Sequence, residues 1–399
     1  MHIDVNNAYL SWTAIDLLNK GSKYDIRNSY AVIGGDEDSR HGIVLAKSMP
    51  AKKLGIKTAE TLFSARKKCP NLRVYPTNFS LYNEMPNKLF NLIAGYSPDI
   101  EVASVDECYL DYTSVKKLYG NPIDFAYKLK KEIYDKLGFT VNIGIANNKL
   151  CAKMASDFEK PYKVHTLFMD EVKTKMWPLF IGDLYGVGKM SVPKLTSLGI
   201  NTIGDLAHAD YNKLFKFFKN QSLDLINKAR GIDNSIVDSS TWIPKGIGNE
   251  FTLERDLKDR SQVYKYLMQL SDKVGRRLRN QDKYASVVVV VLKDKYFKRK
   301  SHQMKLDNAT NVTSEIYELS KKIFDEMWNE EPIRLIGVRL DNLTDEKKYQ
   351  VSLFENIKNS ESDETLDKLV DSLKNKFGSN IINKASLTKD KSTNDEIKN

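Results

Sequence analysis

The sequence has little cysteine and no long apolar run. Cys69, Cys108 and Cys151 lie far apart and form no CxxC pair or Cys/His cluster. This spacing does not suit a disulfide framework or a zinc site, and it predicts buried thiols in a reducing cytosol. The longest apolar run, residues 287–292, is far too short to span a bilayer, and residues 1–4 do not resemble a signal peptide. We therefore expect a cytoplasmic protein with no membrane partner.

The charge of the chain is basic. Its 399 residues include 62 Lys and Arg against 52 Asp and Glu, which gives a formal net charge of +10 and a pI of about 9.1. Such a balance favours a polyanionic partner such as nucleic acid, although many basic proteins bind none. The length exceeds the usual size of one hydrophobic core, so we expect roughly two to four domains.

Short apolar runs typical of strands recur in the first 165 residues. They lie at residues 30–33, 72–75, 100–104, 109–112 and 140–145. Apolar residues at spacings of three and four predict helices at 83–95 and 123–137. Strands mixed with helices in this order predict an α+β or α/β core.

The rest of the chain divides into three parts. Residues 166–237 show only short helices broken by glycines, and the Ser- and Thr-containing stretch 238–242 is typical of a linker. A second α+β domain follows, with strands expected at 248–253, 285–292, 300–306 and 333–340 and helices at 261–280 and 312–328. From residue 356 one amphipathic helix is expected, and the final dozen residues are predicted to be disordered.

Three carboxylates are candidates for chemistry. Asp106 and Glu107 are adjacent in a strand-like run, so both can serve one site only if the backbone turns or bulges there. An acidic pair in an exposed hairpin is the alternative. Asp4 follows a very short apolar start, and its alternative role is that of a helix N-cap. Together the three would suit two divalent cations, and oxygen ligands favour magnesium.

Several motifs occur in an order that resembles one family. Residues 4–9 (DVNNAY) and 104–107 (SVDE) look like the paired signature of Y-family DNA polymerases, with closest similarity to bacterial DNA polymerase IV and UmuC-like proteins. Further matches follow at residues 96–101, 144–149, 152–157 and 160–161. Any one of these could arise by chance, whereas the ordered set is very specific.

The resemblance implies an α+β multidomain, right-hand polymerase with a ferredoxin-like palm, small fingers, a helical thumb with a helix-hairpin-helix and an α+β little finger. The expected boundaries are: palm 1–11 and 75–165, fingers 12–74, thumb 166–237, linker 238–242, little finger 243–355, and an amphipathic helix with a disordered tail at 356–399. We expect a monomer.

The resemblance also implies roles in the catalytic centre. Asp4 and Asp106 would bind metal with the backbone carbonyl of Val5, and Glu107 would complete the site beside the primer 3′ hydroxyl. Two Mg²⁺ ions per active site are expected. Tyr9 falls where the family keeps an aromatic steric gate that excludes a 2′ hydroxyl, and its alternative role is an ordinary core aromatic.

Other residues are expected to bind substrates and partners. By position, Lys160 and Lys52 would contact the incoming triphosphate as compact cations. Residues expected to contact the DNA backbone are Gly186, Gly188 and Lys189 in the hairpin of the thumb and Lys298, Arg299, Lys300, Arg334 and Arg339 in the little finger. Residues 350–354 (QVSLF) resemble a sliding-clamp peptide, in which Gln350, Ser352, Leu353 and Phe354 would make the contacts.

The predicted function is error-prone translesion synthesis by a DNA-directed DNA polymerase. It would add dNTPs to the 3′ end of a primer by a two-metal mechanism, without proofreading, on primer-template DNA and in company with a sliding clamp. Only three residues precede Asp4, so the first strand is expected to be short. The alternative is therefore a catalytically impaired protein that keeps the fold and binds DNA and the clamp.

Overall fold

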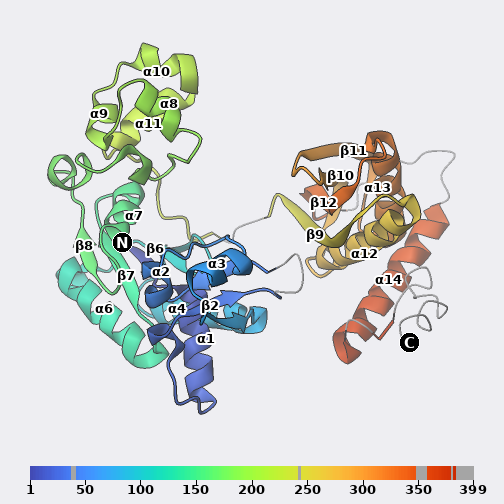
Figure 1. Ribbon diagram of the computed structural model, residues 1–399, viewed down its shortest axis with the longest axis horizontal. Helices are drawn as coiled ribbons and strands as arrows, with labels where there is room; N and C mark the ends of the chain where they lie inside the picture. The colour runs from blue at the N-terminus through green and yellow to red at the C-terminus, as the bar shows by residue number, and fades with distance from the viewer. Residues whose placement is uncertain (37–41, 241–243, 347–356, 379–380, 383–399) are drawn as a thin grey trace. The chain divides into compact units, whose positions relative to one another are not determined.

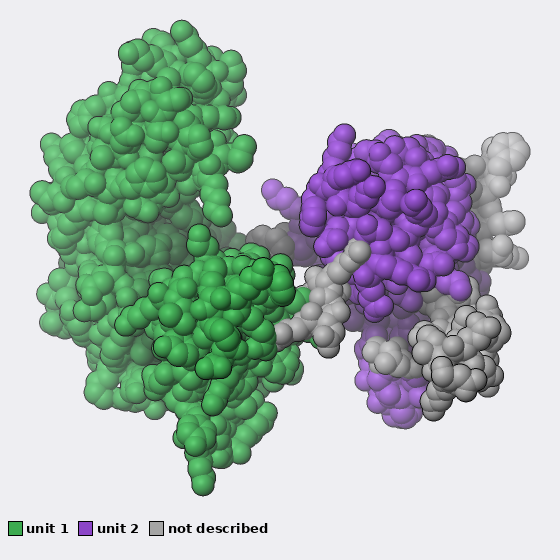
Figure 2. Space-filling view, in the orientation of Figure 1, with its two compact units in different colours: residues 1–241 green, residues 242–399 purple. Residues whose placement is uncertain are grey.

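The structure is a computed structural model of the 399-residue chain that describes residues 1–36, 42–240, 244–346, 357–378 and 381–382. The chain forms two compact units, residues 1–241 and 242–399, which are coloured separately in Figure 2. No helix within the described ranges is long and apolar enough to cross a membrane.

A five-stranded sheet forms the centre of the first unit. Its strand order is β5 (Ile100–Val102), β6 (Glu107–Leu110), β1 (His2–Val5), β7 (Val141–Ile145) and β8 (Val164–Thr166). The four-residue strand β1 runs antiparallel to both β6 and β7, and all of its residues are buried. A short first strand is therefore sufficient to place Asp4 in the middle of the sheet.

Helices cover both faces of this sheet (Figure 1). On one face, α1 (Ala8–Asn19), α4 (Phe79–Ala94) and α6 (Pro122–Leu137) share an apolar core with the strands, and a short helix, α5 (Lys116–Tyr119), precedes α6. On the other face, α7 (Lys149–Asp157) lies against β7.

The close approach of α7 to β7 depends on Gly144. A Cβ atom at this position would lie 1.9 Å from the carbonyl oxygen of Ala152 and 2.6 Å from the backbone nitrogen of Ser156, closer than any side chain permits. Gly144 thus lets the helix backbone rest directly on the strand. As a result, the side chains of α7 reach over β1 and β6.

Two smaller parts of the first unit have cores of their own. Strands β2 (Ala31–Gly34), β3 (Val44–Lys47) and β4 (Arg73–Pro76) form a second sheet that packs on α2 (Met49–Lys53) and α3 (Leu62–Lys68), with η1 (Ile26–Asn28) before it. The helical part contains η2 (Val172–Met176), η3 (Ile181–Asp183), α8 (Val192–Ser197), α9 (Ile203–Ala207), α10 (Tyr211–Phe218) and α11 (Gln221–Ala229). Its buried residues form a cluster that α7 joins.

The second unit is an antiparallel sheet with helices on one face. The strand order is β11 (Arg299–Thr310), β10 (Tyr284–Asp294), β12 (Ile333–Thr344) and β9 (Gly246–Leu257). Helices α12 (Arg260–Arg279) and α13 (Thr313–Met327) pack on one face of this sheet and enclose the core with it.

The last helix, α14 (Ile357–Phe377), packs on α12 and α13 through charged residues. Asp371 and Asp367 pair with the buried Arg279 at 2.7 and 3.1 Å. The apolar face expected for this helix is largely uncovered, because Leu366 and Phe377 are 58% and 60% exposed. The predicted disordered tail lies mostly outside the described residues.

The predicted α+β multidomain class is confirmed, and most predicted elements lie within a few residues of the observed ones. Two strands were missed, β3 and the short β8. The predicted strand at 100–104 ends at Val102, because residues 104–106 form a bend. This bend supplies the turn that the adjacent acids Asp106 and Glu107 require.

Candidate active site

The two faces of the central sheet differ in polarity. Along β1, Ile3 and Val5 point into the apolar core, whereas His2 and Asp4 alternate with them and point to the face that α7 covers. Register places Glu107 of β6 opposite Asp4, and its side chain lies on the same face. Strand alternation thus brings two carboxylates together beneath one helix.

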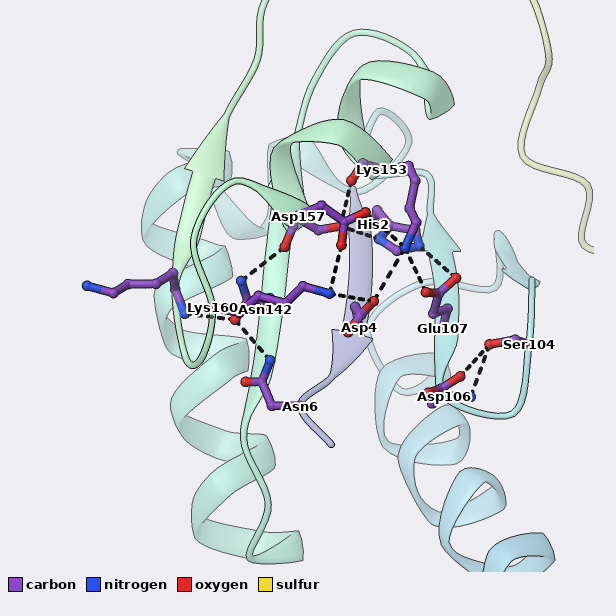
Figure 3. A network of polar contacts seen from close by, with 12 residues as sticks. His2, Asp4, Asn6, Ser104, Asp106, Glu107, Asn142, Lys153, Asp157 and Lys160 are labelled. Carbon is purple, nitrogen blue, oxygen red and sulfur yellow. Dashed lines mark hydrogen bonds and ion pairs between the residues drawn. The ribbon is translucent and has the colours of Figure 1, made fainter. Parts of the chain in front are cut away.

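Two lysines balance the charge of these carboxylates (Figure 3). The Nζ atom of Lys153, on α7, lies 2.7 Å from Glu107 and 3.4 Å from Asp4. The Nζ atom of Lys160, just after α7, lies 3.0 Å from Asp4. Asp157 joins both lysines, at 3.3 Å from Lys153 and 2.7 Å from Lys160. The result is a compact network in which every carboxylate contacts at least one cation.

His2 completes the inner wall of this network. Its ring is fully buried, its Nδ1 atom lies 2.8 Å from the hydroxyl of Ser156, and that hydroxyl donates to the backbone oxygen of Lys153. The other nitrogen, Nε2, faces a Glu107 oxygen at 3.7 Å. Burial lowers the pKa of His2, so the neutral ring is favoured.

The two facing carboxylates have opposite pKa shifts. Burial raises the pKa of Asp4 to about 7, although Lys160 and Lys153 oppose the shift. The neighbouring His2 nitrogen and the Lys153 ammonium hold the pKa of Glu107 well below its usual range. Near neutral pH the pair therefore holds its proton on Asp4, the more buried member.

Asp106 lies apart from this pair. Its carboxylate accepts a hydrogen bond of 2.6 Å from the Ser104 hydroxyl and points away from Lys153, as Figure 3 shows. Its backbone oxygen accepts a hydrogen bond from the Val5 nitrogen at 3.0 Å, so it stays next to the end of β1. Asp106 and Glu107 lie at the turn between β5 and β6 but are half-buried rather than exposed, and Asp4 is part of a strand rather than a helix N-cap.

Hard oxygen ligands suited to Mg²⁺ are present here. The carboxylates of Asp4 and Glu107 converge, and the ammonium groups of Lys160 and Lys153 pair with them. A site that attracts these two cations is also suited to a divalent cation. Asp106 is one residue away but bonded to Ser104. In the described part of the chain, no three Asp, Glu, His or Cys side chains lie close enough to hold a metal together. Asp4 and Glu107 therefore suit a metal ion as a pair of ligands, and Asp106 lies next to them.

Tyr9 lies at the base of α1, between the apolar core and Asp106. Its half-buried ring packs against Tyr82 at 4.6 Å and edge-on against Trp12 at 5.7 Å, measured between ring centroids. Burial, and secondarily the negative charge of Asp106, raise the pKa of its phenol. The ring is thus fixed on its inner side and close to a predicted catalytic acid.

The two lysines predicted to bind triphosphate have different surroundings. Lys160 belongs to the network described above. Lys52 is exposed on the short helix α2, where it lies near Lys47 and contributes, after burial, to lowering the pKa of that lysine. Two neighbouring cations, Lys52 on α2 and Lys47 at the end of β3, are suited to a phosphate group.

The glycines of the predicted hairpin lie on an exposed turn before α8. Gly186 has a φ of +93°, a conformation that side-chain-bearing residues rarely adopt, and Gly188 and Lys189 follow it at the surface. The backbone nitrogens of Ser191 and Val192 bond to the oxygen of Gly188, which closes the turn.

The basic residues of the second unit lie at the surface of its sheet, and acids pair with three of them. Arg299 pairs with Glu250 at 2.5 Å, Arg339 with Asp341 at 2.7 Å, and Lys300 with Glu331 at 3.5 Å. Two others complete the set: Lys298, which is exposed, and Arg334, which stacks on the ring of Phe297. The predicted clamp residues Gln350, Ser352, Leu353 and Phe354 lie outside the described residues.

Sequence reasoning missed three members of the network, His2, Lys153 and Asp157. The alternation of His2 and Asp4 with Ile3 and Val5 was a usable signal for a strand with one polar face. Lys153 and Asp157 have the i,i+4 spacing of an ion pair on a helix, but only the fold shows that this pair lies over the carboxylates.

Comparison with known proteins connects this site to a family. Residues 3–157 match the model of the impB/mucB/samB family, and residues 244–353 match the model of its C-terminal domain. DNA polymerase IV of Clostridium acetobutylicum is 46% identical over 387 residues, which cover 97% of each chain. DNA polymerase IV of Alkaliphilus oremlandii is 37% identical and covers 90% of this chain and 92% of its own.

Solved structures agree in fold. A chimera of the Y-family DNA polymerases Dbh and Dpo4 superimposes with a TM-score of 0.74 at 24% identity, over 86% of this chain and 98% of the chimera. An insertion ternary complex of Dbh DNA polymerase gives a TM-score of 0.60 at 25% identity with the same coverage. These matches do not favour the alternative hypothesis of a catalytically impaired protein that keeps the fold. The chain therefore belongs to the impB/mucB/samB family of Y-family DNA polymerases and is a DNA-directed DNA polymerase.

Proposed function

We propose that this polymerase extends primers across damaged templates by a two-metal mechanism centred on Asp4, Asp106 and Glu107. The observation that carries the proposal is the convergence of Asp4 and Glu107 on one face of the sheet, with Lys160 beside them. Two bound Mg²⁺ ions would lower the pKa of the attacking 3′ hydroxyl and neutralise charge on the leaving pyrophosphate.

Each residue would have a distinct task. Asp4 and the backbone oxygen of Val5 would hold the ions from the end of β1, and Glu107 would face the primer end. The hydrogen bond with Ser104 holds the Asp106 carboxylate beside Asp4 and Glu107. On metal binding, Asp106 would exchange this hydrogen bond for a metal contact. Lys160 would then bind the triphosphate, because its ammonium is partly exposed on the same face.

Tyr9 would select the sugar. A ring held by Tyr82 and Trp12 cannot retreat into the core, so a 2′ hydroxyl on an incoming nucleotide would collide with it. Lys52 would assist Lys160 at the triphosphate from α2, as a second compact cation.

The remaining parts would hold primer-template DNA. We assign palm to residues 1–11 and 75–165, fingers to 12–74, thumb to 166–237 and little finger to 243–355. Separate apolar cores within residues 32–74 and 247–343 support the fingers and the little finger. The turn at Gly186 and Gly188 and the basic sheet residues would bind phosphates without reading sequence.

We further propose that residues 350–354 bind a sliding clamp and that the polymerase acts as a monomer without proofreading.

Primer extension with Mg²⁺ tests the proposal. Asp106→Ala should lower the rate of nucleotide addition by about 10³-fold, because it removes charge stabilisation at the reacting phosphate. Binding of primer-template, measured by fluorescence anisotropy, should stay within about twofold.

Asp111→Asn is the matched control. Asp111 is an acid just beyond the other end of β6 and bonds to the backbone nitrogen of Thr113. Its replacement should leave extension unchanged. If Asp106→Ala extended primers as fast as this control, the proposed catalytic centre would be wrong.

A further inference from the structure

Two buried asparagines connect the central sheet to the segment that follows α7. Asn142 of β7 is fully buried, and Asn6, just beyond β1, is 7% exposed. The Nδ2 atom of Asn6 donates to Oδ1 of Asn142 at 3.1 Å. Both residues lie beside the carboxylate network rather than in it (Figure 3).

Asn142 makes every hydrogen bond that its amide allows. Its Nδ2 atom donates to the backbone oxygens of Ser156 at 3.0 Å and Glu159 at 2.7 Å. Its Oδ1 atom accepts from Asn6 and from the backbone nitrogen of Lys163, the latter at 3.2 Å. A buried amide with two donors and two acceptor sites all in use has only one orientation. A carboxylate at this position would place an oxygen against two carbonyl oxygens.

Asn6 holds the same segment at a third point. Its Oδ1 atom accepts a hydrogen bond from the backbone nitrogen of Tyr162 at 2.9 Å. Tyr162 has a φ of +62°, a left-handed conformation that residues with a side chain rarely adopt. Asn6 is itself fixed, because its backbone nitrogen donates to the backbone oxygen of Thr140 and its backbone oxygen accepts from the Ser11 hydroxyl. The hydrogen bond thus helps to hold a backbone conformation that the chain would otherwise avoid.

Lys160 lies inside the segment that this amide pair fastens. Backbone groups at residues 156, 159, 162 and 163 are all held, so the point from which the Lys160 side chain extends is fixed. Its Nζ atom then reaches Asp4 at 3.0 Å and Asp157 at 2.7 Å. A lysine has a long, flexible stem, so fixing its backbone removes much of the freedom that binding would otherwise have to restrict.

We propose that Asn142 and Asn6 are positioning residues for Lys160, which set where its ammonium meets the triphosphate of the incoming nucleotide. This inference rests on the proposed role of Lys160 in triphosphate binding. The two amides act through the backbone of residues 156–163 and do not touch the nucleotide. Their loss therefore weakens nucleotide binding more than it slows the chemical step.

The test is a double-mutant cycle in single-nucleotide insertion on the full-length protein. Asn142→Asp should raise the KM for dNTP about tenfold and change kcat by less than about threefold. Lys160→Ala should raise the KM at least as much. The double variant should match Lys160→Ala alone, because the asparagine has nothing left to position.

Three results would overturn the inference. The first is an unchanged KM in Asn142→Asp, which leaves the role of Lys160 intact. The second is an increase that multiplies with that of Lys160→Ala, which shows that the asparagine acts by another route. The third is an unchanged KM in Lys160→Ala, which removes the proposed role of Lys160 and the inference with it.

Two further variants separate positioning from folding. Asn148→Ala removes another amide that holds α7, at its first turn, where it accepts from Cys151 and donates to Gly231. This control should lower the Tm and leave the KM for dNTP unchanged. If Asn142→Asp does not fold, Asn6→Ala replaces it in the cycle, since Asn6 supports the same segment through Tyr162, and the same outcomes decide.

Discussion

The carboxylate network of the first unit and the basic sheet surface of the second unit use charge in opposite ways. Asp4 and Lys153 are each 7% exposed, and each contacts more than one ionised partner. Arg339 and Arg299 are exposed and each pairs with one acid on the sheet. Charges interact strongly where water is excluded and weakly at a wet surface, where pairs contribute about 0–1 kcal/mol.

This difference suits two kinds of recognition. A buried network defines one geometry, so each member has a task that its neighbours cannot take over. Exposed cations on a strand can follow a phosphate backbone without fixed positions, and acids such as Asp341 can release them at little cost. We therefore expect single substitutions to have large, specific effects in the first region and small, similar effects in the second.

Tyr9→Ala should give the largest effect on selectivity. Removing the ring beside Asp106 opens space for a 2′ hydroxyl, so discrimination against ribonucleotides should fall on the order of 100-fold. The measurement is the ratio of kcat/KM for dNTP and rNTP on one primer-template. Tyr9→Phe keeps the ring and should keep the discrimination. Equal sugar selectivity in Tyr9→Ala and the parent protein would mean that Tyr9 is an ordinary core aromatic.

Lowering the pH should weaken magnesium binding by about tenfold. Burial raises the pKa of Asp4 to about 7, so this carboxylate is mostly ionised at pH 8 and mostly protonated at pH 6. A ligand must lose its proton before it binds metal, so the Mg²⁺ concentration for half-maximal extension should rise as the pH falls through 7. The measurement is Mg²⁺ titration of single-nucleotide insertion at pH 6, 7 and 8.

The surface of the second unit provides the comparison for this pH effect. A guanidinium group in general stays charged between pH 6 and pH 8, so DNA affinity at constant ionic strength should change by less than about twofold over this range. A magnesium requirement that stays constant over this range would show that Asp4 is ionised throughout, and that the network is less strongly buried than its contacts indicate.

The sequence was sufficient for the class of fold because its apolar periods are local. The continuous apolar run in β10 and the three-and-four spacing in α6 predicted those elements to within a few residues. Strand β3 was missed, since its four residues, with only one of them fully buried, give too short a pattern. The adjacent acids at 106 and 107 correctly required a turn, which the bend at 104–106 provides.

The surroundings of the site depended on contacts between distant segments. Nothing local marks Lys153 as buried, because lysines are rarely inside, and its burial follows from the approach of α7 at Gly144. The four hydrogen bonds of Asn142 join residues 14 to 136 positions away, which no periodic pattern predicts. The motif predicted Asp106 as a metal ligand, but no sequence pattern predicts its hydrogen bond with Ser104.

Arg339→Ala should have the smallest effect, and its size tests the comparison directly. Arg339 lies on the sheet face opposite α12 and α13, paired across β10 with Val289 and held by Asp341 at the surface. Loss of one phosphate contact should weaken primer-template binding about two- to fivefold, whatever the DNA sequence. It should also reduce the slope of the logarithm of the binding constant against the logarithm of the salt concentration by about one. Fluorescence anisotropy over a range of salt concentrations measures both quantities, while the KM for dNTP should not change.

Asp341→Asn, which frees the arginine, should strengthen binding slightly. A loss of 100-fold or more, or one that depends on the template sequence, would mean that this surface is as specific as the carboxylate network, because only a residue with an irreplaceable contact costs that much.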